Sequence, residues 1–120
     1  MLNSRSVSNL YGVTPKLVEV VTLARELSEV EFEITEGVRS IERQQQLVKE
    51  GKSRTLKSYH ILGRAVDVVA YRDGKVTWDF EEYRKIAKAF KEAANQLNVR
   101  ITWGGDWVTF RDGVHFQIEE

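Results

Sequence analysis

The sequence of 120 residues contains no cysteine and a single proline. Without cysteine, disulfide bonds and thiolate metal sites are excluded, so histidine, aspartate and glutamate remain as the strong metal ligands. The 18 basic and 18 acidic side chains cancel, so no net field attracts the chain to nucleic acid or to an anionic membrane. We therefore expect a partner that is not a polyanion, and no binding of nucleic acid.

Long hydrophobic runs are also missing from the start of the chain. Serine, asparagine and arginine interrupt residues 1–12, which are too polar for a signal peptide or a membrane span. We expect synthesis in the cytoplasm without Sec-dependent export, and no membrane insertion. The length and the apolar fraction of 42% suit one compact core rather than two domains. We predict one domain over residues 1–120, with residues 1–13 as an N-terminal extension.

The first half of the chain predicts two helices and one strand. Apolar residues recur at helical spacing over 14–28, where Thr14 suits the cap and Pro15 the first helical position. Polar and apolar residues alternate over 31–35, as in a half-buried strand. A second helix is predicted over 40–51, between a serine cap and a terminal glycine.

The second half predicts more strands and a third helix. Its expected elements are a central strand over 65–71, a turn at 73–74, a strand over 75–77, a helix over 79–98, and strands over 100–102 and 114–118. Helices interspersed with hairpin-linked strands predict an α+β domain. We expect a small, mostly antiparallel sheet with about three helices packed on one face, and the functional site on the other face.

The two histidines of the chain, His60 and His115, each lie near a carboxylate in the sequence. His60 precedes Asp67, a charge inside an apolar strand that is costly to bury unless it is paired or metal-bound. Alternation over 114–118 directs His115 away from the core face. Singly, each residue also suits an ordinary role: a loop histidine, a backbone-bonded aspartate and a surface histidine. Together, two imidazoles and one carboxylate make a three-ligand zinc set with a position open for water, if they converge.

The segment 58–67 resembles the S-x-H-x-x-G-x-A-x-D signature of the zinc D-Ala-D-Ala metallopeptidases. This family includes vancomycin-resistance dipeptidases, carboxypeptidases and phage L-alanyl-D-glutamate endolysins. Asp112-x-x-His115 is similar to the second half of the family site. Gly37-x-Arg39-Ser40, followed by Gln45, is similar to its arginine-bearing segment, and 103–107 to its Gly-rich aromatic loop. The phage-type endopeptidases are the most similar branch, because the acid is an aspartate where the other branches carry glutamate.

The resemblance implies one zinc ion per chain, held by His60, Asp67 and His115. It implies that Asp112 is the general base and then the acid for the leaving amine. Asp112 also has an ordinary interpretation, because Asp112-Gly113 is a good turn dipeptide before a strand.

The resemblance gives Arg39 the role of binding a substrate carboxylate or stabilising the oxyanion, whereas the ordinary alternative is a surface arginine beside a helix cap. Ser58 is expected to support the site by a hydrogen bond within the zinc loop or to substrate. Gly63 is expected to allow a tight turn between the ligands. Trp103 and Trp107 suit either the peptide groove or the core, so we assign them no role.

The function expected from the resemblance is hydrolysis of peptidoglycan stem peptides, between L-Ala and D-Glu, by a monomeric phage or prophage endolysin without a separate wall-binding module. Such an enzyme would reach the cell wall through a holin or on cell death. One alternative is a D,D-carboxypeptidase or D-Ala-D-Ala dipeptidase, whose substrate would need a cationic clamp from either Arg39 or Arg64. Two others are a non-catalytic zinc-containing binding domain of the same fold, and a structural protein with an incidental metal site.

Overall fold

The computed structural model describes residues 1–52, 59–109 and 111–119 of the chain. The described helices, in order, are α1 (Ser4–Asn9), α2 (Pro15–Leu27), α3 (Ile41–Lys49), α4 (Phe80–Leu97) and the short 3-10 turn η1 (Gly104–Asp106). The described strands are β1 (Glu31–Glu36), β2 (Ala65–Arg72), β3 (Lys75–Thr77), β4 (Arg100–Trp103) and β5 (His115–Glu119). The predicted α+β class is confirmed, and none of these helices is long and apolar enough to cross a membrane.

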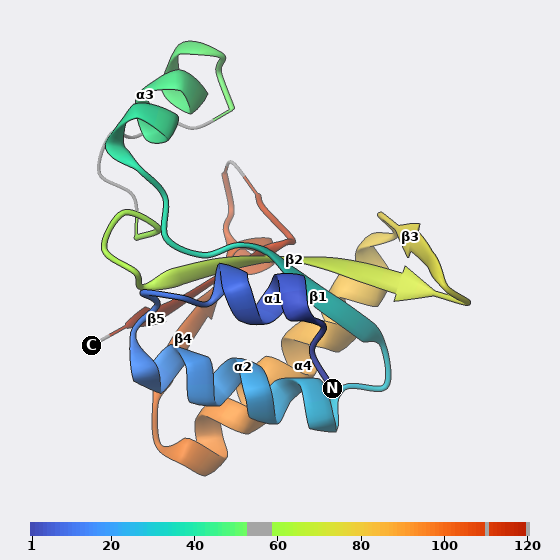
Figure 1. The fold of residues 1–120 in the computed structure, drawn as a ribbon. Helices are drawn as coiled ribbons and strands as arrows, with labels where there is room; N and C mark the ends of the chain where they lie inside the picture. The colour runs from blue at the N-terminus through green and yellow to red at the C-terminus, as the bar shows by residue number, and fades with distance from the viewer. Residues whose placement is uncertain (53–58, 110, 120) are drawn as a thin grey trace.

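The strands form one sheet in the order β1-β2-β5-β4, and each pair is antiparallel. Strand β3 pairs with the far end of β2, beyond β5 (Figure 1). The predicted central strand is therefore β2, which has neighbours along both edges. Apolar β-branched residues in β2 suit this covered position.

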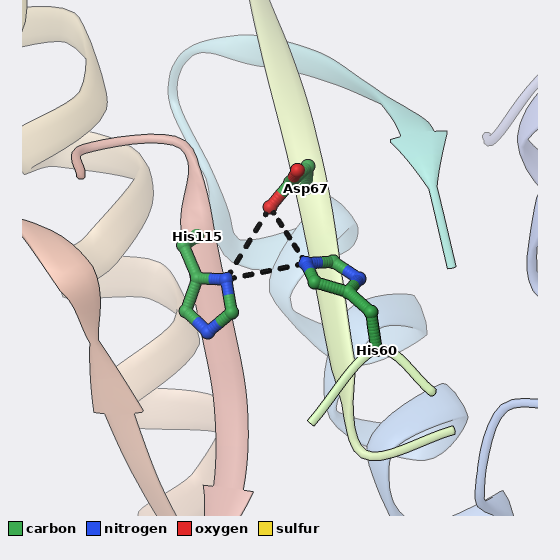
Figure 2. Close-up of side chains that lie close together, drawn as sticks. All are labelled: His60, Asp67 and His115. Atoms are coloured by element: carbon green, nitrogen blue, oxygen red, sulfur yellow. Dashed lines mark hydrogen bonds and ion pairs between the residues drawn. The ribbon is translucent and has the colours of Figure 1, made fainter. Parts of the chain in front are cut away.

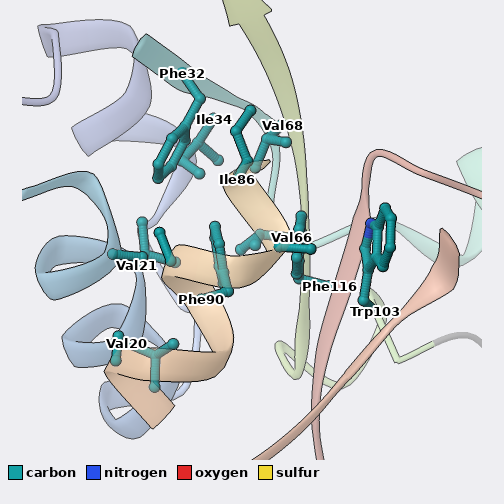
Figure 3. Packing of buried hydrophobic residues seen from close by; sticks show 14 of the residues in the cluster. Val20, Val21, Phe32, Ile34, Val66, Val68, Ile86, Phe90, Trp103 and Phe116 are labelled. Carbon is teal, nitrogen blue, oxygen red and sulfur yellow. The ribbon is translucent and has the colours of Figure 1, made fainter. Parts of the chain in front are cut away.

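Helices α2 and α4 cover one face of the sheet and enclose the core with it (Figure 1). Val21 of α2, Phe90 of α4 and Phe116 of β5 are all fully buried in this core (Figure 3). The rings of Phe90 and Phe116 stack with centroids 3.9 Å apart. Because alternate residues of a strand point to opposite faces, each core residue of β2 and β5 directs its neighbours to the other face.

Two further helices lie outside the pair that covers the core face. Helix α3 projects away from the core face (Figure 1), and its buried residues are only Gln44 and Leu47. Residues 1–13, predicted as an extension, contain α1, whose Ser6 hydroxyl donates to Glu33 of β1 at 2.6 Å. A helix this short lacks a periodic apolar stripe, so its fold depends on polar contacts that a hydrophobic pattern does not reveal.

Candidate metal centre and active site

The sheet register places the acidic and imidazole side chains of three strands side by side. Asp67 of β2 is the direct cross-strand partner of His115 of β5 and of Glu36 of β1. Neighbours of Asp67 in β2, such as Val66, are buried in the core, as is Phe116 beside His115. Asp67 and His115 therefore share the face opposite the core, as expected from the sequence.

The second imidazole comes from the turn over residues 59–64, which carries His60 over this face. Gly63 in this turn has a φ of +72°, and a Cβ on it would collide with the carbonyl oxygen of Gly12. The Gly63 carbonyl accepts a hydrogen bond from Thr14 N–H at 2.8 Å. The predicted tight turn at Gly63 is thus present, and it fixes the His60 segment against the N-terminal part of the chain.

Three atoms converge at the centre of the site (Figure 2). His60 Nε2 lies 3.1 Å from Asp67 Oδ1 and 3.2 Å from His115 Nδ1, and the last two atoms are 3.5 Å apart. Ligands of a tetrahedral zinc ion with bonds of 2.0–2.1 Å are about 3.3 Å apart. The spacing and donor types of this cluster therefore fit a single metal ion with one position left for water.

The outer nitrogen of each imidazole also has a partner. His60 Nδ1 lies 2.8 Å from the carbonyl oxygen of Gly37, which can only accept, so the proton of a neutral His60 is on Nδ1. This leaves the lone pair of His60 Nε2 facing the centre of the cluster. His115 Nε2 lies 2.8 Å from Gln117 Oε1. Both histidines thus have the outer partner that metal-binding imidazoles require.

The charges at the centre are strongly coupled. Burial alone would raise the pKa of Asp67, but hydrogen bonding with His115 and His60, and the positive charge of these imidazoles when they are protonated, hold it well below its ordinary value. Burial alone would lower the pKa of His115, but hydrogen bonding and charge from Asp67, with smaller contributions from Gln117 and Asp112, raise it. Without a metal ion, the negative charge of Asp67 therefore favours a proton on His115, as it would favour a bound cation.

Arg39 is buried beside Asp67 rather than exposed on the surface. Its Nη1 donates to Gln44 Oε1 at 2.6 Å and its Nη2 to Glu36 Oε1 at 2.7 Å. The same Nη2 lies 3.6 Å from Asp67 Oδ2, the oxygen that faces away from the histidines. Arg39 therefore restrains the second oxygen of Asp67 while the first faces the imidazoles.

The sequence interpretation missed Glu36 and Gln44. A bulge between Ile34 and Glu36 shifts the register of β1 and pairs Glu36 with Asp67, which alternation alone does not predict. The glutamine that contacts Arg39 is Gln44, whereas Gln45 is exposed. Helical phase could have identified Gln44, because it lies three residues before the buried Leu47.

Asp112 lies at the edge of the cluster, half-buried in the loop before β5. Its carbonyl oxygen accepts from His115 N–H at 3.3 Å, and its own N–H donates to the carbonyl oxygen of Gly104 at 3.0 Å. A Cβ on Gly104 would collide with the Asp112 carbonyl oxygen and lie 3.1 Å from the His115 Cβ, so this close approach requires glycine. Burial and the charge of Asp67 raise the pKa of Asp112, although nearby histidine charge opposes them.

The remaining residues considered from the sequence differ in their positions. Ser58 lies outside the described residues, so its role stays a prediction. Trp103 is a core residue whose Nε1 donates to the Gly113 carbonyl at 2.7 Å. Trp107 is half-buried, and the centroid of its ring lies 5.2 Å from that of His115. Of the two tryptophans, only Trp107 therefore touches the cluster.

Three protein ligands with one open position are typical of catalytic rather than structural metal sites. A small α+β domain with such a cluster and an adjacent carboxylate defines the class of single-metal hydrolases. Residues 1–117 match the family model described as phage L-alanyl-D-glutamate peptidase. The chain belongs to this family.

Known proteins resemble the chain in sequence and in structure. The L-alanyl-D-glutamate peptidase of Escherichia phage T5 is 36% identical over 85% of this chain and 77% of its own length. The peptidoglycan L-alanyl-D-glutamate endopeptidase CwlK of Bacillus subtilis is 29% identical over 92% of this chain and 74% of its own length. The crystal structure of the Serratia marcescens L-Ala D-Glu endopeptidase ChiX superposes with a TM-score of 0.94, at 45% identity, over 99% of this chain and 90% of that one.

Proposed function

We propose that this chain is a zinc-dependent endopeptidase that hydrolyses the L-Ala–D-Glu bond of peptidoglycan stem peptides. The observation that carries the proposal is the convergence of His60 Nε2, Asp67 Oδ1 and His115 Nδ1 beside Asp112, at the spacing of tetrahedral zinc ligands. The substrate class is supported by the family, whose named relatives include endopeptidases for this bond.

Zinc held by His60, Asp67 and His115 would polarise the scissile carbonyl and lower the pKa of its bound water. Asp112 takes the proton of the attacking water on its carboxylate and later returns it to the leaving amine nitrogen. Its raised pKa suits this exchange, because a group that both takes and returns a proton works best near the ambient pH.

Arg39 contributes positive charge close to the reacting carbonyl and orients Asp67. Its two terminal nitrogens already bind Gln44 and Glu36, so a substrate carboxylate would have to displace one of these partners. With both terminal nitrogens engaged, Arg39 would act on the oxyanion through its charge and without a new hydrogen bond, which favours this role over two-point carboxylate binding. Ser58 retains its proposed supporting role through a hydrogen bond in the zinc loop or to substrate.

The same contacts favour an endopeptidase over a D,D-carboxypeptidase or dipeptidase. A substrate that ends in a free carboxylate needs a cationic clamp, and Arg39 is engaged within the protein, so a carboxypeptidase would depend on Arg64 instead. Digestion of purified sacculi followed by mass spectrometry of the muropeptides distinguishes these activities. Peptides that begin with D-Glu support the proposal, whereas loss of terminal D-Ala indicates the carboxypeptidase. Intact sacculi with zinc-loaded protein would indicate a non-catalytic domain.

We further propose that the enzyme acts as a monomer on the cell wall after release through a holin or on cell death. All of the proposed ligands and Asp112 come from one chain, so a second copy is not needed to complete the site. Light scattering of the zinc-loaded protein tests the monomer directly. An activity that rises with the second power of protein concentration would contradict it.

A further inference from the structure

One face of β5 carries a line of polar side chains that begins at His115. Residues two apart in a strand point to the same side, so His115, Gln117 and Glu119 share the site face. The outer nitrogen of His115 lies 2.8 Å from Gln117 Oε1, and Gln117 Nε2 donates to Glu119 Oε2 at 2.8 Å. The other oxygen of Glu119 accepts from the Tyr59 hydroxyl at 3.0 Å. Tyr59 directly precedes His60, so the line returns to the second imidazole.

Hydrogen-bond direction along this line is determined by Glu119. Burial opposes its ionisation, but hydrogen bonds from Gln117, Thr102 and Tyr59 hold the pKa of Glu119 below its ordinary value. An ionised carboxylate only accepts, so the amide nitrogen of Gln117 must face it. The amide oxygen must then face His115, and only a protonated Nε2 can donate to that oxygen.

This direction matters because two acceptors compete for the proton on the other nitrogen. A neutral imidazole carries one N–H, and Asp67 Oδ1 lies 3.5 Å from His115 Nδ1. The unprotonated His60 Nε2 is also only 3.2 Å from that atom. Without an opposing acceptor, these contacts would draw the proton to Nδ1, the atom that a metal needs free.

We propose that Gln117, oriented by Glu119 and Tyr59, is a positioning residue that keeps the His115 proton on Nε2 and so leaves Nδ1 free for the metal. The inference rests on the proposed function only in taking this cluster as the metal site. Loss of such an outer partner typically lowers metal affinity by about 10- to 100-fold. Gln117 is half-buried and contacts the outer nitrogen of His115, so its effect on catalysis would pass through His115.

The test combines zinc affinity with the tautomer of His115. Gln117→Leu is expected to weaken zinc binding about 10- to 100-fold in competition with a chromophoric chelator. In metal-free protein at a pH where His115 is neutral, long-range ¹H–¹⁵N spectra should show Nε2–H in the wild type and a population of Nδ1–H in the variant. Gln96→Leu is the matched control, because Gln96 donates to Glu92 at 3.1 Å in an exposed pair on α4.

Exchanging the amide of Gln117 with the carboxylate of Glu119 distinguishes a positioning role of Gln117 from a merely structural one. In the double variant Gln117→Glu/Glu119→Gln, the new carboxylate accepts from His115 Nε2–H and the new amide donates to that carboxylate. Zinc affinity and the Nε2–H tautomer should return to within a few-fold of wild type. The single variant Gln117→Glu places two carboxylates together and should bind zinc less well than the double variant.

Several outcomes overturn the inference without touching the proposed function. If wild type binds zinc and cleaves sacculi, and folded Gln117→Leu matches it in zinc affinity and tautomer, Gln117 does not position His115. If Gln117→Leu does not fold, the double variant provides the test. The inference is refuted if the double variant binds zinc no more tightly than Gln117→Glu. Absence of zinc binding by the wild type would instead refute both proposals.

Discussion

Replacing Asp112 by asparagine tests whether this residue transfers protons or only shapes the turn before β5. Asparagine keeps the size of the side chain, and its amide oxygen can still accept the backbone hydrogen bond from Val114 N–H. Asp112 is not among the three residues whose donor atoms converge, so the variant should retain zinc. What it loses is the ability to take a proton from water and return it to the leaving amine.

The expected loss in turnover follows from that single change. A positioned acid–base group contributes about 10²- to 10⁴-fold to the rate, and each factor of ten corresponds to about 1.4 kcal/mol of activation free energy. Asp112→Asn should therefore raise the barrier by roughly 3 to 5 kcal/mol, with little change in substrate affinity. Release of soluble muropeptides from sacculi measures the turnover, and elemental analysis of the same sample measures zinc.

Asp106→Asn provides the control, because Asp106 is an exposed aspartate of η1 that pairs with Lys91 at 2.8 Å. This variant should keep the wild-type rate. An Asp112→Asn enzyme that cleaves sacculi at close to the wild-type rate would show that Asp112 is a turn residue. Loss of zinc along with activity would make Asp112 a ligand and refute its role as a proton carrier.

Other predictions concern the metal and the loops that hold the site. Chelation should abolish hydrolysis, and about one equivalent of zinc should restore it; full activity without metal would contradict this. Zinc at 1,000 times its dissociation constant should add about 4 kcal/mol to the free energy of unfolding, and His115→Ala should lose this increment in thermal melts. Because the folded pKa of His115 is raised above 6.5, the metal-free protein gains stability from its proton below that pH. Its melting temperature should fall as pH rises through the folded pKa, and a flat profile from pH 6 to 9 would contradict the coupling with Asp67. Gly104→Ala should cost about 1–3 kcal/mol by displacing Asp112, seen as a lower melting temperature together with lower activity.

The strands, and the faces on which Asp67 and His115 lie, could be predicted from the sequence because each depends on local pattern. Alternation fixed the face of His115, and a lone aspartate in an apolar strand indicated Asp67. Their convergence with His60 could not be derived from pattern, since it depends on which strands pair and in which register. The family resemblance supplied that information, and the distances of 3.1 to 3.5 Å among the donor atoms agree with it.

The contacts that surround the ligands were not predictable in the same way. Glu36 reaches Arg39 through a bulge in β1, and a bulge has no clear signature in a six-residue strand. Gln117 reads as an ordinary polar residue of an alternating strand, although its position two residues after His115 implies a shared face. Its role depends on the neighbour Glu119, whose charge directs the amide. Residues that hydrogen-bond to the outer side of a ligand are therefore recognised from the direction of their hydrogen bonds, which only the three-dimensional structure reveals.

The three proposed ligands and Asp112 differ in what holds them in place, and this difference determines how the site responds to change. Asp67 and His115 are cross-strand partners, and Val66, Val68 and Phe116 beside them are fully buried, so the core restrains their relative position. His60 and Asp112 come from turns held by close backbone contacts at Gly63 and Gly104. Because the core already restrains the strand pair, we expect zinc binding to restrain mainly the two turns. Metal binding should therefore reduce hydrogen exchange in residues 59–64 and 104–112 far more than in β2 and β5. If zinc slowed hydrogen exchange equally in the turns and in the strands, the stability of the sheet itself would depend on the metal, contrary to this expectation.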